Sequence, residues 1–153
     1  MRNFIPLICS VLLATSLIQA QNATYDVYVI NPSNGDGNLI QIEMRYQADP
    51  DAFYLIDNVN NPVESITGYL TDKPCVNLHL YVPATSESLL FNDFTLTSGN
   101  INEYRDFFVQ WNEKVSGKII IHSLSLHETG STPDLIKKLS SLTGVPVEIV
   151  RYY

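Results

Sequence analysis

Segments typical of strands and segments typical of helices alternate along this sequence, and their order limits the fold more than any other feature. Five segments rich in β-branched and aromatic residues predict strands, at 25–30, 53–56, 76–82, 118–124 and 147–150. Strands separated by helices form βαβ units, and such units build a parallel sheet. The sequence therefore predicts an α/β fold with a mainly parallel sheet and helices on both faces, in a Rossmann-like three-layer arrangement.

Capping residues mark where the predicted helices begin. Asn61, Pro62 and Glu64 have the spacing of a capped helix start, because the Asn side chain can accept from a free backbone N–H and proline is tolerated in the first turn. Asn100 and Glu103 repeat that spacing before an apolar stripe that we expect to continue to residue 115. A third helix is predicted from residue 131, and a small hairpin over 88–97 turns at residues 92–93.

Residues 39–47 fit two structures. Apolar and polar residues alternate in this stretch, as in a strand. However, parallel strands at 25–30 and 53–56 need a crossover between them, and a helix is the usual one. The crossover requirement slightly favours a helix.

Three consecutive isoleucines, Ile119 to Ile121, lie in the predicted fourth strand. A continuous apolar run is typical of a strand that is covered on both faces. We therefore expect Ile120 to be fully buried and Ile120→Ala to cost about 2–5 kcal/mol of stability. Ser125→Ala, in the loop beyond this strand, should cost little.

The first twenty residues predict a secretory signal peptide. Arg2 supplies the positive start, residues 4–18 are mostly apolar, and Ala20 is the small residue that the peptidase needs at the cut. The apolar run is shorter than the roughly 20 residues of a membrane span. Cleavage would leave one secreted domain, residues 21–153, with no stable membrane insertion.

The charge balance limits the partners of this domain. The chain has 9 Lys and Arg residues against 16 Asp and Glu residues, a formal net charge of −7. Such a chain is poorly suited to nucleic acid or to anionic lipid, because both repel negative charge. No motif indicates a cofactor. We therefore expect the partner to be a protein or a surface ligand.

Three segments share their order and spacing with a known family: 52–57 with the helix after it, 76–81 with the hairpin at 88–90, and 111–144. In this pattern the chain resembles an uncharacterised bacterial domain near the N-terminus of large secreted adhesins that carry cadherin-like or calcium-binding repeats. That family is distantly similar to the caspase-type (clan CD) cysteine peptidases. The resemblance implies a caspase-like three-layer fold.

The resemblance also implies a His-Gly pair at the end of the strand matching 76–82 and a Cys at the end of the strand matching 118–124. Here the first position reads Tyr81-Val82-Pro83-Ala84, and Leu124 lies nearest to the second. A peptidase of this type needs a thiolate and an imidazole within hydrogen-bond reach. No catalytic residue carries over, which predicts a domain without this activity.

One polar cluster remains as a candidate site: His122, Ser123, Ser125, His127 and Glu128. It follows a parallel strand, and open parallel sheets bind their ligands at that edge. A serine hydrolase could use Ser123 or Ser125 as nucleophile and His127 as base, although no Gly-x-Ser-x-Gly elbow surrounds either serine. Two histidines and a glutamate could also bind a metal, but the spacing matches no known zinc signature. A solvated loop is the third interpretation and the one that such short matches favour.

After cleavage of the signal peptide, Cys75 is the one cysteine of the mature chain, so no internal disulfide can form. His79 is four residues away, a separation of about 13 Å along a strand. The two side chains therefore cannot pair, and we expect Cys75 to be buried and inert. Two functions follow: a secreted non-catalytic domain that acts in binding or cell-surface interaction, or a secreted hydrolase that uses the His122–Glu128 cluster.

Overall fold

The computed structural model describes residues 23–31, 52–57, 59–85, 87–123 and 133–150. Within these residues, five strands form one parallel sheet in the order β2-β1-β3-β6-β7. The strands are β1 (Val27–Ile30), β2 (Phe53–Leu55), β3 (Leu78–Tyr81), β6 (Ile119–His122) and β7 (Val147–Val150). The predicted α/β fold, with a mainly parallel sheet flanked by helices, is confirmed.

The strand order reverses direction once. The chain runs from β1 outward to β2, then returns past β1 to β3 and continues to β6 and β7. In an open α/β sheet, the loops beyond two such strands diverge and leave a crevice at their carboxyl ends. The fold therefore makes the carboxyl ends of β1, β2 and β3 the expected position of a ligand site.

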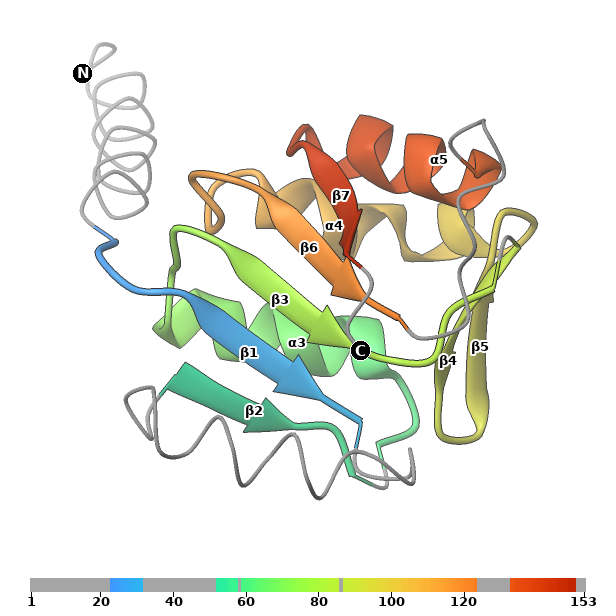
Figure 1. Cartoon of the computed structure of the whole chain (residues 1–153), viewed down its shortest axis with the longest axis horizontal. Coiled ribbons are helices and arrows are strands. Elements are labelled where there is room, and N and C mark those ends of the chain that lie inside the picture. The colour runs from blue at the N-terminus through green and yellow to red at the C-terminus, as the bar shows by residue number, and fades with distance from the viewer. Residues whose placement is uncertain (1–22, 32–51, 58, 86, 124–132, 151–153) are drawn as a thin grey trace, which may run out of the picture.

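A separate antiparallel hairpin lies at that same edge. It consists of β4 (Ser88–Phe91) and β5 (Phe94–Thr97), and Figure 1 shows it beyond the arrowhead of β3. Its turn is at Asn92–Asp93, as predicted, and Asn92 has a positive φ of 50°. Asn tolerates this left-handed backbone better than most residues, which explains its place in a two-residue turn.

Three helices of the described residues pack on one face of the sheet and share one hydrophobic core with it. They are α3 (Pro62–Asp72), α4 (Arg105–Trp111) and α5 (Asp134–Thr143), and α4 contacts both of the others. Figure 1 shows α3 and α4 behind the sheet. The strand residues that face this core alternate along each strand: Val27, Val29, Leu78, Leu80, Ile119 and Ile121. None of the helices in the described part of the chain is long and apolar enough to cross a membrane.

The residues between these core positions point to the opposite face of the sheet, because strand side chains alternate. Ile120 is one of them, and it is only partly buried. The prediction that Ile120 is fully buried is therefore wrong: the isoleucine run divides between two faces that differ in cover. The helix predicted over residues 39–47 lies outside the described residues.

The predicted helix starts were correct in one case and altered in another. Asn61 Oδ1 accepts from Glu64 N at 3.2 Å, so the cap of α3 is as predicted. Asn100 makes no such cap, because its Oδ1 instead accepts from Thr97 N at 2.7 Å and closes the turn after β5. The next helix therefore begins as a 3₁₀ turn (Ile101–Tyr104), and α4 ends at Trp111, earlier than the apolar stripe predicted.

We expect Ile121→Ala to destabilise the fold by about 2–5 kcal/mol, because Ile121 is 0% exposed and truncation leaves a cavity in the core. Ile120→Ala is the matched control: the same substitution one residue earlier, on the partly exposed face, should cost clearly less. Urea unfolding of both variants at pH 7.5 measures the difference. Equal losses would show that both faces of β6 are equally buried.

Candidate functional site

The structure describes two residues of the predicted polar cluster, and it places them differently. His122 is the last residue of β6 and is partly buried. Ser123 is 2% exposed, and its hydroxyl donates to the carbonyl oxygen of Ala84 at 3.3 Å. A buried hydroxyl that donates to a backbone carbonyl is unsuited to nucleophilic attack. Ser125, His127 and Glu128 lie outside the described residues.

His122 belongs instead to a chain of three side chains that the sequence prediction missed. His122 Nε2 lies 2.8 Å from His79 Nδ1, and His79 Nε2 lies 3.2 Å from Asp26 Oδ2. These residues are far apart in sequence, and only the strand register brings them together. We call this arrangement the Asp26–His79–His122 chain.

Adjacent strands, and two hydrogen bonds that Asn77 donates to Asp26, position the Asp26–His79–His122 chain. β3 lies between β1 and β6, so His79 in β3 is flanked by both neighbours. Asp26 directly precedes β1, and its Oδ1 accepts from the backbone N and the side-chain Nδ2 of Asn77, each at 3.0 Å. These two bonds hold the carboxylate in place, and they leave its other oxygen directed at His79.

Aromatic rings continue the chain across the face of the sheet opposite to α3, α4 and α5. Ring centroids are 5.3 Å apart for Phe53 and Tyr28, 4.6 Å for Tyr28 and His79, and 5.1 Å for His79 and His122. The ring of Tyr81 stacks on His122 at 4.0 Å, with an angle of 4° between the ring planes. This stacking fixes the imidazole planes, so both the position and the orientation of the histidines are set.

The hydrogen-bond order defines which nitrogens carry protons at neutral pH. The Asp26 carboxylate can only accept, so Nε2 of His79 must donate to it. The neutral His79 ring then accepts at Nδ1, which requires His122 to donate from Nε2. One carboxylate thus determines the tautomers of both rings.

Burial keeps both rings neutral. It lowers the pKa of His122 to about 4, with a smaller contribution from the neighbouring His79. Burial also lowers the pKa of His79, and Asp26 partly opposes that effect. An imidazole with a low pKa is a weak general base at pH 7. The Asp26–His79–His122 chain is therefore better suited to stabilising the fold than to removing a proton.

Cys75 is buried in the hydrophobic core, as predicted. It is 0% exposed. Its backbone pairs with that of Val115 in an isolated parallel β-bridge before β3 begins. Burial raises the pKa of its thiol to about 12. The thiolate is the reactive form of cysteine, so this residue does not supply a nucleophile.

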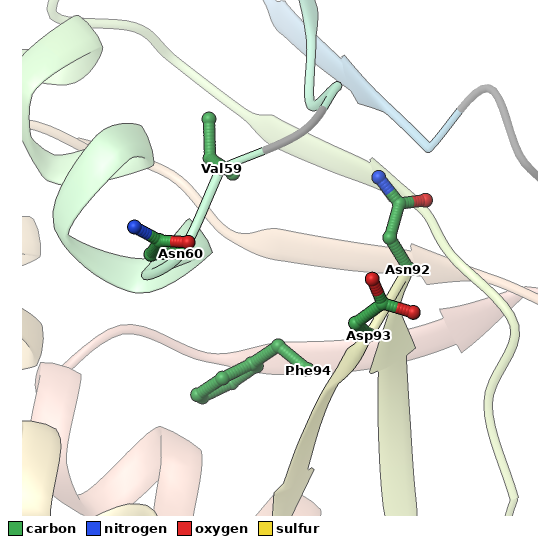
Figure 2. A pocket seen from close by; sticks show the side chains of 5 residues that line it. All are labelled: Val59, Asn60, Asn92, Asp93 and Phe94. Carbon is green, nitrogen blue, oxygen red and sulfur yellow. The ribbon is translucent and has the colours of Figure 1, made fainter.

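A pocket at the carboxyl edge of the sheet is a second candidate site, also missed by sequence analysis. It has a volume of about 380 Å³ and is lined by Val59, Asn60, Asn92, Asp93 and Phe94. Figure 2 shows its two sides: Val59 and Asn60 come from the segment before α3, and the other three come from the hairpin turn and the start of β5.

Two features of Asn92 shape this pocket. Its Nδ2 donates to the carbonyl oxygen of Ile56 at 3.3 Å, which ties the hairpin turn to the residue after β2. Its Oδ1 is buried and has no hydrogen-bond partner. The pocket therefore adjoins an acceptor that the fold leaves unsatisfied, and such atoms are uncommon in folded proteins.

Among the described residues, no group of three or more His, Cys, Asp and Glu side chains is placed to hold a metal ion. Comparisons with family models, with curated proteins and with solved structures find no match to this chain. The resemblance to the adhesin-associated, caspase-like domains therefore stays a prediction. The site must be judged on its own geometry.

We expect Cys75 to be unreactive in the folded protein. In a Cys9→Ser chain, where it is the one thiol, treatment with a disulfide reagent at pH 8 should leave it unmodified, because the buried thiol is not ionised. Denaturation in urea should allow complete labelling. Mass spectrometry measures the modified fraction, and rapid labelling of the native chain would contradict the burial.

Proposed function

We propose that this chain is a secreted, non-catalytic α/β domain that acts by binding, and that the pocket at the carboxyl edge of the sheet is its binding site. One observation carries the proposal: the lining combines two amides, one carboxylate and one aromatic ring at the edge where open parallel sheets bind ligands. Among the described lining residues there is no Ser, Thr, Cys, Lys, His or Tyr that could act as an activated nucleophile, and the one carboxylate, Asp93, is exposed to water.

The other candidate nucleophiles among the described residues support the same proposal. The caspase-like resemblance would require a thiolate at the carboxyl ends of the central strands. There the chain has Tyr81 at the end of β3, and His122 followed by the buried Ser123 at the end of β6. Cys75 lies at the opposite end of β3 and is protonated. A binding role requires none of these groups to react.

The lining also indicates the chemistry of the ligand. Asp93 is exposed and Asn60 is exposed, so a carboxylate and an amide are available at the pocket mouth. One of the two amide N–H groups of Asn92 is already used on Ile56. Acceptors therefore exceed donors, which favours a ligand with hydroxyl or amino groups, on a partner protein or on a surface glycan. The net charge of −7 favours neutral or cationic ligands.

A secreted hydrolase that uses the His122–Glu128 cluster is the second candidate function. One observation favours it: His122 is oriented by His79 and Asp26 in the manner of a general base held by a carboxylate. The low pKa of His122 and the buried hydroxyl of Ser123 place this function second.

Binding can be tested with two probes that differ in charge, methyl glucoside and argininamide. We expect saturable NMR shifts in the backbone amides of Asn60, Asn92 and Asp93 with at least one probe. Asp93→Asn should weaken that binding about tenfold, because a charge-assisted hydrogen bond contributes about 1.5 kcal/mol or more. Asp106→Asn, which changes an exposed carboxylate on α4, is the control. No shift with either probe would contradict the pocket as the binding site.

We expect no turnover of peptide or ester substrates by the secreted chain. A peptide library and a set of chromogenic esters, followed by mass spectrometry and absorbance, measure this. Turnover that disappears in His122→Ala and persists in Cys75→Ala would replace the binding function with the hydrolase function.

A further inference from the structure

The Asp26–His79–His122 chain has no part in the pocket, yet it joins a carboxylate and two imidazoles through contacts of 3.2 and 2.8 Å. Its two imidazoles meet nitrogen to nitrogen at 2.8 Å, and such a contact contains one proton. The contact therefore responds to the number of protons that the pair holds.

We infer that the Asp26–His79–His122 chain is an acid-sensitive unit: it accepts one proton with its hydrogen bonds intact and loses the His79–His122 bond when it accepts a second. This inference goes beyond the proposed binding function and does not rest on it. It follows from the hydrogen-bond geometry, and the burial of both rings sets the acidity that is required.

The first proton can be taken up while both contacts within the Asp26–His79–His122 chain are kept. An imidazolium on His79 carries N–H groups at both nitrogens, and its Nε2–H still faces the Asp26 carboxylate at 3.2 Å. Its Nδ1–H then donates to His122 Nε2, which becomes the acceptor as the proton of His122 moves to Nδ1. The bond between the rings reverses its direction and is kept.

The second proton cannot be taken up in the same way. Both rings would then carry N–H groups on all four nitrogens, so two N–H groups would face each other across the 2.8 Å contact. The two positive charges would also repel each other. The rings must separate, which removes His122 from the stack of rings between β3 and β6.

Among the described residues, other charged groups on this face of the sheet are few. Tyr28 and Tyr81 contribute their rings, and burial, with a smaller effect of Asp26, raises the pKa of Tyr28, so it stays neutral in acid. Lys118, directly before β6, and Glu148, on β7, pair with each other at 2.9 Å. Among the described residues, Asp26 is therefore the charged group in direct contact with the histidine pair.

The direction of the stability change follows from the lowered pKa values. A histidine whose pKa is lower in the folded state than its ordinary value of about 6.5 is kept neutral by folding. The unfolded chain then binds more protons in acid. The stability that the neutral pair provides is complete above about pH 6.5, and it is lost as the pH falls toward about 4.

The test is an NMR titration of the full chain from pH 8 to pH 3.5, in a His127→Gln background that removes the third histidine. We expect both rings to be neutral at pH 7, His79 to take up the first proton below pH 6.5, and the coupling across the ring-to-ring bond to vanish near pH 4. Asp26→Asn should lower the first midpoint, and Glu148→Gln, on the same face, should not. Midpoints of about 6.5 for both rings in every variant would overturn the inference.

A second measurement covers variants that fold poorly. The urea midpoint of the unsubstituted chain should fall between pH 7.5 and pH 4.5, and His79→Phe/His122→Phe should reduce that fall while keeping the ring stack. An equal fall in both chains would also overturn the inference. Ligand binding at pH 7.5 is unaffected by either outcome, so failure here is distinct from failure of the proposed function.

Discussion

The side chain of Asn77 joins the three central strands, and the site geometry depends on it. Its Nδ2 and backbone N both donate to Asp26 Oδ1 before β1, and its Oδ1 accepts from Lys118 N before β6 at 3.2 Å. A Cβ at Gly117 would come within 2.7 Å of that same oxygen, so the neighbouring position must lack a side chain. This one amide aligns the starts of β1, β3 and β6. The alignment in turn places His79 between Asp26 and His122.

The two faces of the sheet use different physical means of stabilisation. The helix-covered face is apolar, and a buried polar contact within it is satisfied: Trp111 Nε1 donates to Thr67 Oγ1 at 2.8 Å, and that hydroxyl donates to the carbonyl of Val63 at 2.7 Å. The other face holds stacked rings and a carboxylate. Alternation along each strand makes both possible from one sequence, and it explains why Ile120 differs from Ile119 and Ile121.

Local patterns predicted much of this fold, and long-range contacts explain the remainder. The α/β class, the α3 cap at Asn61 and the hairpin turn at residues 92–93 all depend on residues within a few positions of one another. The predicted helix cap at Asn100 is wrong, because its side-chain oxygen accepts a hydrogen bond from Thr97 N instead. The Asp26–His79 contact spans 53 positions, so only the strand order and register could reveal it. A polar residue before one strand and a histidine in another carry no shared local signal.

The pocket and the histidine pair also differ in their capacity to bind a ligand, because their polar groups differ in exposure to water. Asn60 and Asp93 are exposed at the pocket mouth, so a ligand can replace the water on them at modest cost. His79 and His122 are partly buried and already bonded to each other, so a ligand would first have to break that bond. Binding is therefore favoured at the pocket. The histidine pair is suited to protons, the first of which is small enough to enter without displacing a ring.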